Sequence, residues 1–309
     1  MRTLVGDRRG LSLVELIVVL AIAGLVGGAI GATLVRQQRF YRGATELLYA
    51  RQGVRDALEV LSTDIRGMSP ADTVRIFADS AIELFATIGT SVVCQGMAND
   101  VGLPAARASG NSLSAFLIEP DSGDLALFHT YSADSGEHWQ RYRISSFAPR
   151  SLASTCPVAS RMSQGSDFVA GATGFVLTLA TPLRSGVRPG AAVRFVRRGR
   201  YSLYRASDGE WYLGYRRCNA VGPSVCGAVQ PVSGPYRRYS ANRAATGLLF
   251  EYFDVAGRRL DPGSPLAIAR VDVTARTESG QLLSTRAQSG RISDSATVSI
   301  AIRNMVHAR

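Results

Sequence analysis

The chain opens with a long apolar run that contains a single ionisable residue. From Leu11 to Val35 every side chain is apolar, small or hydroxylic, except that of Glu15. As a helix, this run would rise roughly 37 Å, enough to cross a hydrocarbon layer of about 30 Å with some tilt. A secretory signal would have a shorter apolar region and a small-residue cleavage site behind it, whereas RQQR follows here. We therefore predict a transmembrane helix over residues 11–35.

The hydrophobic pattern keeps a helical period beyond the apolar run. Apolar side chains recur at steps of three and four, and Arg51 interrupts them: Phe40, Ala44, Leu47, Val54, Leu58, Leu61, Ile65 and Met68. Gly67 and Pro70 signal the end of the helix. A long coiled coil would show a similar stripe. We interpret residues 36–69 as a stalk whose last turns pack on a head, which gives one helix of about 55 residues and roughly 80 Å.

The remaining chain, residues 70–309, changes to a period of two. Alternation predicts strands in GFVLTLAT, VRFVRRGRYSLYRA, EWYLGYRRC, LLFEYFDV, ARVDVTART and ATVSIAIRN. Turn signals lie at SDG (207–209) and VAGR (255–258), and segments 95–112 and 279–295 are interpreted as exposed loops. No helix-length pattern separates the strands. We predict an α+β chain in which a long N-terminal helix precedes one head domain rich in antiparallel β-sheet.

Composition and cysteine usage narrow the class of protein. The chain has 309 residues, of which 46% are hydrophobic and 19% charged, which excludes a disordered or collagen-like protein. All four cysteines follow the apolar run, and none forms a C-x-x-C pair: Cys94, Cys156, Cys218 and Cys226. Such a set fits disulfides in an oxidising compartment, although buried free thiols are an alternative. Three pairings are open, and we favour Cys218 with Cys226 because they close a short loop.

The net charge of +11 raises the question of a nucleic-acid partner. The chain contains no lysine, which indicates a coding bias rather than a binding site. Cations and aromatic side chains nevertheless alternate as in single-strand binders: Arg197, Arg198, Arg200, Tyr201, Tyr204, Arg205, Tyr212, Tyr215, Arg216, Arg217, Tyr236, Arg237, Arg238 and Tyr239. We favour the interpretation that these residues fill the exposed face of a sheet, and nucleic acid is kept as an alternative partner.

Local signatures of enzymes are missing from the sequence. It contains no H-E-x-x-H, G-x-S-x-G, dinucleotide fingerprint, P-loop or EF-hand spacing. The histidines are too scattered to indicate a metal site: His129, His138 and His307. Two further charged pairs lie in DSGD and SGEHW, where turn residues explain them: Asp121 with Asp124, and Glu137 with His138. We therefore expect no catalytic residue, no metal and no cofactor.

The carboxylate of Glu15 needs an explanation, because an ionised carboxylate at membrane depth costs several kcal/mol without a partner. Snorkelling to the interface is one solution. The stretch RRGLSLVELIVVLAIAGLV also resembles the processing and assembly signal of type IV prepilins. The resemblance implies a leader over residues 1–10, cleavage after Gly10 by a prepilin peptidase, and methylation of the new amino terminus at Leu11. It also implies that Glu15 neutralises the terminal amine of a neighbouring subunit. The first mature residue is usually Phe in that family, and Leu11 stands in its place here.

The order of elements resembles that of PilW-type minor pilins and of J-type minor pseudopilins of type II secretion. The resemblance is carried by ELLYARQGVRDALEVLSTDIRGM, RYSLYRASDGEWYLGYR, GLLFEYFDVAGRRL with ARVDVTART, and ATVSIAIRN. It implies a subunit that primes filament assembly and sits at or near the tip of a type IV pilus. The alternatives are a J-type minor pseudopilin and a minor pilin of a DNA-uptake pilus.

The same resemblance sets expectations for location and partners. It implies a single-pass inner-membrane protein with a cytoplasmic N-terminus and a periplasmic head over residues 70–309, which later joins an extracytoplasmic pilus or pseudopilus. Expected partners are prepilin peptidase, other minor and major pilins or pseudopilins, the inner-membrane assembly platform, and a tip adhesin or secretin-bound substrate. A cytoplasmic motor would supply ATP hydrolysis.

Overall fold

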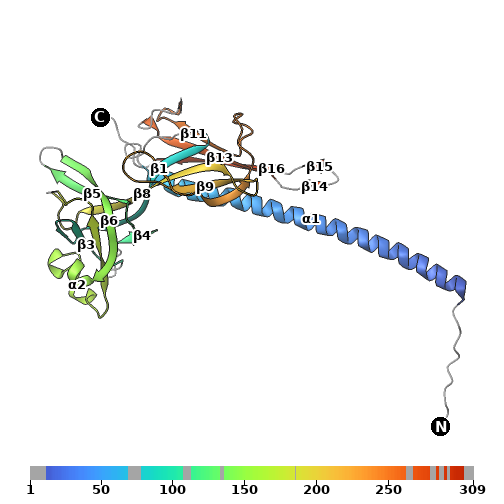
Figure 1. The fold of residues 1–309 in the computed structure, drawn as a ribbon, viewed down its shortest axis with the longest axis horizontal. Helices are drawn as coiled ribbons and strands as arrows, with labels where there is room; N and C mark the ends of the chain where they lie inside the picture. Colours follow the sequence, from blue (N-terminus) through green and yellow to red (C-terminus); the bar gives the residue numbers. More distant parts are fainter. Residues whose placement is uncertain are drawn as a thin grey trace, which may run out of the picture. The chain divides into compact units, whose positions relative to one another are not determined.

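A single helix forms the N-terminal part of the chain. The computed structural model describes residues 12–68, 78–106, 113–132, 136–184, 186–261, 267–278, 283–284, 289–290 and 293–302. Helix α1 (Leu13–Gly67) has 55 residues, as predicted, and runs unbroken through the apolar run and the stalk stripe (Figure 1). It ends at Gly67, where the sequence signals its end, whereas Pro70 lies outside the described residues.

Most strands belong to one large sheet, in which the neighbouring strands of the described residues pair antiparallel. Its order is β10-β9-β8-β5-β6-β7-β3-β2, with β1 beside β8 and β4 beside β1. The strands are β1 (Ala81–Val92), β2 (Gln95–Met97), β3 (Asp100–Leu103), β4 (Ala115–Phe116), β5 (Leu125–Ser132), β6 (Gly136–Ser151), β7 (Thr173–Leu179), β8 (Ala192–Arg205), β9 (Trp211–Arg217) and β10 (Gln230–Tyr236). Between β6 and β7 lie the short helix α2 (Leu152–Thr155) and two 3-10 turns, Val158–Ser160 and Gly165–Asp167.

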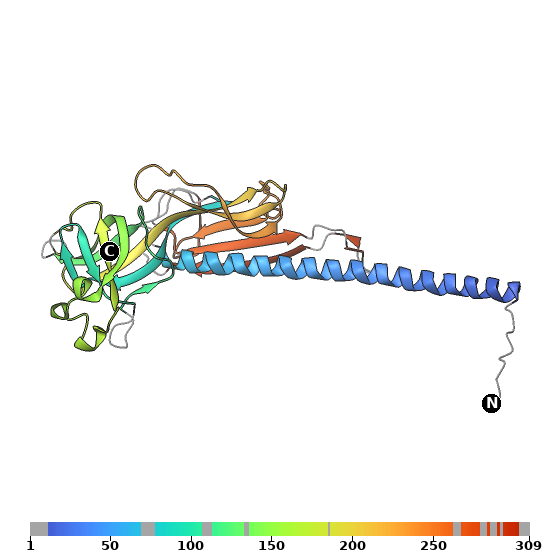
Figure 2. The same ribbon diagram turned by 60° about the horizontal axis from the view of Figure 1, so that its bottom comes forward.

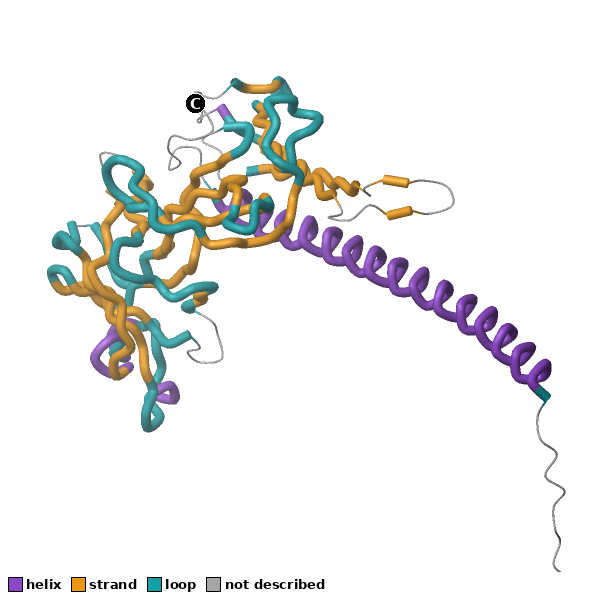
Figure 3. Tube along the Cα trace, turned by 45° about the vertical axis from the view of Figure 1, so that its right-hand side comes forward, coloured by secondary structure: helices purple, strands orange, loops and turns teal. Residues whose placement is uncertain are grey.

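A second sheet follows in the sequence. It has the order β12-β11-β13-β16 and contains β11 (Leu248–Phe253), β12 (Arg259–Leu260), β13 (Arg270–Glu278) and β16 (Ser293–Ala301). A separate pair joins β14 (Leu283–Ser284) to β15 (Ser289–Gly290). Figure 3 shows α1 in purple and the β-strands in orange. The predicted α+β class, a long N-terminal helix followed by antiparallel β-structure, is confirmed.

Three local predictions were wrong. Segment 95–112 is not a loop throughout, because β2 and β3 lie in it and β3 pairs with β7. Val101 and Leu103 are fully buried there, and this burial offsets the weak strand propensity of the surrounding glycines. Segment 279–295 likewise contains β14, β15 and the start of β16. Glu137 and His138 belong to β6 rather than to a turn, whereas Asp121 and Asp124 do flank a turn.

The chain forms two compact units. One comprises residues 1–52 and 278–293, and the other comprises residues 53–277 and 294–309. The second unit, which we call the head, contains two large apolar cores. The first core is formed by the end of α1, the second sheet and parts of β1, β8, β9 and β10, and includes Leu61, Ile65, Leu84, Phe250 and Val273. The other core lies among β3, β5, β6, β7 and parts of β1 and β8, and includes Val101, Phe128, Leu177 and Phe195.

The ladder between β1 and β8 connects these cores. Leu84 of β1 and Tyr201 of β8 belong to the first core, whereas Ile88 and Phe195 of the same two strands belong to the second. The two strands pair from Ala81 with Ser202 to Val92 with Ala192, with one irregularity near Ile88, and Figure 2 shows them side by side in cyan and yellow. The long ladder explains how one sheet serves both cores of the head.

Tyrosine hydroxyls fix the end of α1 on the sheet. Tyr201 donates to a carboxylate oxygen of Asp64 at 2.6 Å, and Tyr236 donates to the backbone oxygen of Gly53 at 2.8 Å. Burial raises the pKa of Tyr236 to about 12, against a hydrogen bond from Ser233, with a smaller contribution from the charge of Asp56. Burial also raises the pKa of Tyr201, so both hydroxyls are neutral donors at physiological pH.

Candidate functional site

The assembly segment lies at the start of α1. Ser12 precedes the helix, and its hydroxyl accepts a hydrogen bond from the backbone N–H of Glu15 at 3.2 Å. Its backbone oxygen accepts the first helical hydrogen bond, from Leu16 at 3.1 Å. Ser12 is thus the N-cap residue, and Glu15 carries negative charge in the first turn, where the helix dipole favours it. Gly10 and Leu11, the expected cleavage and methylation residues, lie outside the described residues.

The sequence analysis assigned a role to Glu15 but did not identify Ser12 as its hydrogen-bond partner. The stretch S-L-V-E indicates this partner, because it has the S-x-x-E spacing of a capping box. The cap fixes the point at which the helix begins. In a chain cleaved after Gly10, Leu11 alone would precede the cap in the sequence, four positions before Glu15.

The side chains around Glu15 suit a lipid environment. Leu13, Leu16 and Ile17 are 76%, 51% and 56% exposed, and large apolar side chains stay exposed as far as Val35. The most apolar window of α1 has a mean hydropathy of 2.6, and none of that window is buried. By length and composition α1 is able to cross a membrane.

Both pairs of cysteines are joined as disulfides. Cys94 is bonded to Cys156, and Cys218 to Cys226. The first bridge lies in a small apolar cluster with Leu152, next to the point where α2 approaches β3. The second closes the loop after β9, which is the pairing that the sequence favours. Disulfides of this kind persist in an oxidising compartment.

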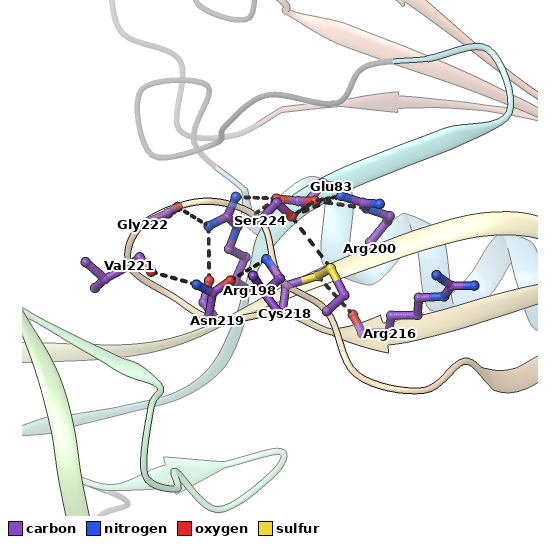
Figure 4. Close-up of a disulfide and its surroundings, with 11 residues drawn as sticks. Glu83, Arg198, Arg200, Arg216, Cys218, Asn219, Val221, Gly222 and Ser224 are labelled. Carbon is purple, nitrogen blue, oxygen red and sulfur yellow. Dashed lines mark hydrogen bonds and ion pairs between the residues drawn. A yellow bond between two sulfur atoms is a disulfide. The ribbon is translucent and has the colours of Figure 1, made fainter.

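A buried carboxylate organises the loop closed by Cys218 and Cys226 (Figure 4). Glu83 of β1 is fully buried and forms ion pairs with Arg198 at 2.5 Å and Arg200 at 2.8 Å. Ser224 of the loop donates a further hydrogen bond to Glu83 at 2.7 Å, and Arg198 donates to the backbone oxygen of Asn219. Burial would raise the pKa of Glu83, but the hydrogen bonds from Ser224 and the two arginines outweigh it and lower the pKa.

Glu83, Cys218 and Cys226 lie as close together as metal ligands do, but their atoms are already bonded to other groups. One oxygen of Glu83 and the two sulfur atoms of Cys218 and Cys226 lie within 4.8 Å of one another. Both sulfur atoms are consumed by the disulfide, and the carboxylate oxygens are bonded to Arg198, Arg200 and Ser224. Two guanidinium groups also repel a cation. The cluster therefore holds the loop in place instead of presenting free ligands.

The structure uses several of the arginines considered for nucleic-acid binding in internal ion pairs. Arg197 pairs with Asp124 at 2.7 Å, and Arg217 pairs with Asp121 and Asp124, both at 3.0 Å. Arg198 and Arg200 are held by Glu83. These four guanidinium groups share the carboxylates of Glu83, Asp121 and Asp124, which leaves one positive charge uncompensated and weakens the case for phosphate binding at this strip. The carboxylates that bind them are distant in sequence, so the alternating pattern could not reveal them.

The two histidines in the described part of the chain do not form one site. His129 lies 3.8 Å from Glu137, and His138 lies 3.1 Å from the hydroxyl of Thr130. Thr130 is opposite His138 in the ladder between β5 and β6, so His129 and His138 project from opposite faces of the sheet. The third histidine, His307, lies outside the described residues.

Comparison with known proteins bears on the N-terminal segment. The family model of the prokaryotic N-terminal methylation motif matches residues 6–31, which include Gly10, Leu11, Ser12 and Glu15. A search of curated proteins found no match to the chain, and neither did a search of solved structures. The motif and the apolar helix are consistent with a pilin anchored in the inner membrane. The motif supports a type IV pilin-like or pseudopilin protein, and it implies processing by prepilin peptidase and assembly with other pilins.

Proposed function

We propose that this chain is a minor pilin-like subunit that primes assembly of a type IV pilus and sits at or near its tip, with a structural rather than a catalytic role. The observation that carries the proposal is the methylation motif over residues 6–31. Within it, Ser12 caps an exposed apolar helix whose first turn contains Glu15. The proposed topology places residues 1–10 in the cytoplasm and the head in the periplasm.

The size and build of the head support a terminal position. The head contains two apolar cores linked by the β1 and β8 ladder. A bulky head is difficult to repeat at the close spacing of helices packed in a filament, where interaxial distances are about 8–10 Å. A subunit at the end of the filament needs no such repetition on its outer side.

Electrostatics gives Glu15 its role in assembly. A carboxylate and an amine that are each stranded in an apolar environment are costly, and pairing them removes both uncompensated charges. The cap on Ser12 places the Glu15 side chain in the first turn of α1. Cleavage after Gly10 would create the required amine at Leu11 of a neighbouring subunit.

The test is to crosslink the native full-length protein in cells and identify its partners by mass spectrometry. We expect type IV pilus subunits and a tip adhesin, and we expect deletion of the gene to abolish or strongly reduce piliation. Recovery of secretion pseudopilins together with an outer-membrane secretin would replace this proposal with the J-type minor pseudopilin. Recovery of neither set would contradict both.

A further inference from the structure

A polar pocket opens in the head beside the last turns of α1. Its volume of about 420 Å³ suits a small molecule, since such sites have volumes of about 300–1,000 Å³. Helix α1, strand β1 and strand β8 contribute to its wall, and every lining residue belongs to the head unit. The lining residues include two arginines and no acid: Ser62, Thr63, Arg66, Gly67, Thr87, Thr90 and Arg194.

An irregularity in β1 explains why two of its threonines line the same pocket. Thr87 and Thr90 are three positions apart, so in a regular strand they would point to opposite faces of the sheet. Between Thr87 and Gly89, the pairing advances by two residues in β1 but by one in β8, which leaves Ile88 as an extra residue. Such a bulge shifts the phase of the alternation by one position. Thr90 therefore lies opposite Arg194 in the ladder, and it lines the pocket together with Thr87.

The hydroxyl groups of the pocket offer both acceptors and donors. Those of Ser62 and Thr63 donate to the backbone oxygen of Glu59 at 2.9 and 3.1 Å. Their oxygen lone pairs therefore stay available to a hydroxyl donor of a ligand. The hydroxyls of Thr87 and Thr90 form no hydrogen bond within the described part of the chain, so each is able to donate or to accept.

Two guanidinium groups give the pocket its positive charge. In the part of the chain that the structure describes, neither Arg66 nor Arg194 forms an ion pair, unlike the four arginines bound by Glu83, Asp121 and Asp124. The guanidinium of Arg194 lies over the ring of Trp139, 5.4 Å from its centroid. Arg66 belongs to the last turn of α1, where the helix dipole favours a cation. Both groups are therefore positioned at the pocket and remain available to an anion.

This combination of groups selects the class of ligand. Guanidinium groups bind carboxylate and phosphate groups through charge-assisted hydrogen bonds. Side-chain hydroxyls that accept and donate match the hydroxyls of a sugar. An inorganic anion would leave the hydroxyl part of the lining unused, and a neutral sugar would gain no ion pair from the arginines. A sugar that carries a negatively charged group fits the whole lining.

We propose that this pocket binds an acidic sugar. Arg66 and Arg194 bind its negatively charged group, and the hydroxyls contributed by α1 and β1 bind its ring hydroxyls. The proposed function assigns no ligand to the head, so this binding site goes beyond it.

The test uses the full-length protein in detergent micelles at low ionic strength, with glucuronate as the probe. Saturation-transfer NMR on the glucuronate protons measures its Kd, and glucose and inorganic phosphate are added as competitors. We expect saturable binding of glucuronate. Glucose lacks the charge and phosphate lacks the sugar ring, so each should compete at least about tenfold more weakly than unlabelled glucuronate competes with itself.

Three outcomes would overturn the proposal. Absence of saturable glucuronate binding would show that the pocket does not take an acidic sugar. Competition by phosphate as strong as that by glucuronate would show a site for a bare anion. Competition by glucose of equal strength would show that the arginines do not contribute.

Variants of the two arginines test whether binding occurs in this pocket. Arg194→Gln and Arg66→Gln each remove one charge, and we expect the Kd for glucuronate to rise by about tenfold in each. Arg270→Gln is the matched control for Arg194→Gln, because the guanidinium of Arg270 also lies over an aromatic ring, at 4.2 Å from the centroid of Phe253. Arg270 does not line the pocket, so the control should leave the Kd unchanged. Equal Kd values in the arginine variants and the control would overturn the proposal.

The hydroxyl part of the lining is tested with Thr90→Val. This change keeps the shape of the side chain and removes its hydroxyl, so the Kd for glucuronate should rise by about threefold or more. An unchanged Kd would contradict the role of the hydroxyls, and thermal unfolding checks that each variant is folded. Processing and filament assembly are measured separately, so failure of sugar binding leaves the proposed function intact.

Discussion

At the scale of single residues, two carboxylates of the head lie in environments that shift their pKa values in opposite directions. Glu83 is fully buried and has two guanidinium partners and a hydroxyl donor. Asp64 has a tyrosine hydroxyl as its donor. The pKa of Glu83 is lowered and that of Asp64 is raised, so ionisation of the first supports folding and ionisation of the second opposes it.

Removing the charge of Glu83 should destabilise the head. In Glu83→Gln, Arg198 would stay buried without its counter-ion, and breaking a buried pair in this way costs about 3–5 kcal/mol. Chemical denaturation of the full-length protein in detergent measures the free energy of unfolding. The control is Glu251→Gln, because Glu251 is 28% exposed and pairs with Arg243 and Arg259 at 3.3 and 3.7 Å. We expect that control to lose less than about 1 kcal/mol. Equal losses in the two variants would contradict this assignment.

Asp64 should contribute more to the stability of the head at acidic pH than at neutral pH. Its folded pKa lies above its ordinary value of 3.8, so its favourable contribution is complete below 3.8 and is lost as the pH rises through the folded pKa. Asp64→Asn should therefore be more stable than the parent at neutral pH, and the advantage should shrink as the pH falls towards 3.8. Thermal unfolding across this range measures the difference.

Asp208→Asn should change the stability at neutral pH in the opposite direction in the same experiment. The pKa of Asp208 is lowered, first by the backbone N–H of Glu210 and then by the hydroxyl of Tyr212. Its contribution is present above the ordinary pKa of 3.8 and is lost as the pH falls through the folded value. If Asp208→Asn stabilised the protein at neutral pH, or Asp64→Asn destabilised it, the directions assigned to the two pKa shifts would be wrong.

At the scale of elements, close backbone approach fixes how helix α2 fits against strand β3. Helix α2 packs against β3 at Gly102, where an added Cβ would lie 1.9 Å from the backbone oxygen of Thr155. The adjacent Cys156 is bonded to Cys94. A disulfide and a glycine therefore act together, one by tying the segments and the other by leaving space between them.

Gly102→Ala should be strongly destabilising because its methyl group would overlap a backbone atom that has no side-chain freedom to move. We expect a loss of at least about 1–3 kcal/mol, the usual cost of forced overpacking, measured by denaturation. Gly165→Ala is the control in the same region, since an added Cβ there meets nothing within 4 Å. A tolerated Gly102→Ala would mean that α2 is not packed closely against β3.

At the scale of the whole molecule, the proposed function assigns processing and assembly to different residues of the N-terminal segment. The methylation motif spans residues 6–31, but Glu15 lies on the helix side of the expected cut after Gly10. If the proposal is right, a variant of Glu15 can separate assembly from processing.

Glu15→Gln should be processed normally and fail to assemble. The variant keeps the shape of the side chain and the hydrogen bond from the backbone N–H of residue 15 to the hydroxyl of Ser12. It cannot form an ion pair with a charged amine. We expect methylated Leu11 at the parental level by mass spectrometry, and recovery in the filament fraction lower by at least about tenfold. Glu46→Gln, on the same helix beyond the apolar run, is the control and should assemble normally. Normal assembly of Glu15→Gln would contradict the role of the charge.

Local patterns predicted those elements whose periodicity is visible in short windows. The apolar run and the stripe up to Met68 predicted α1, and alternation predicted β7, β8, β9, β11, β13 and β16. The strands β1, β5, β6 and β10 were not predicted. The short strands β2 and β3 were missed because a strand of three or four residues with glycine has no readable alternation. The S-x-x-E cap at Ser12 was readable but was overlooked in favour of the charge of Glu15.

The sequence by itself determined the membrane-length helix, the methylation motif, the position of Glu15 and the β-rich class of the head, because these depend on neighbours within a few turns or a few strand positions. Tertiary structure decided which charges are neutralised and which are not. Glu83 meets Arg198 and Arg200 from more than a hundred residues away, as Asp64 meets Tyr201. Strand pairing across such separations sets burial and ion pairs, and no local pattern encodes it.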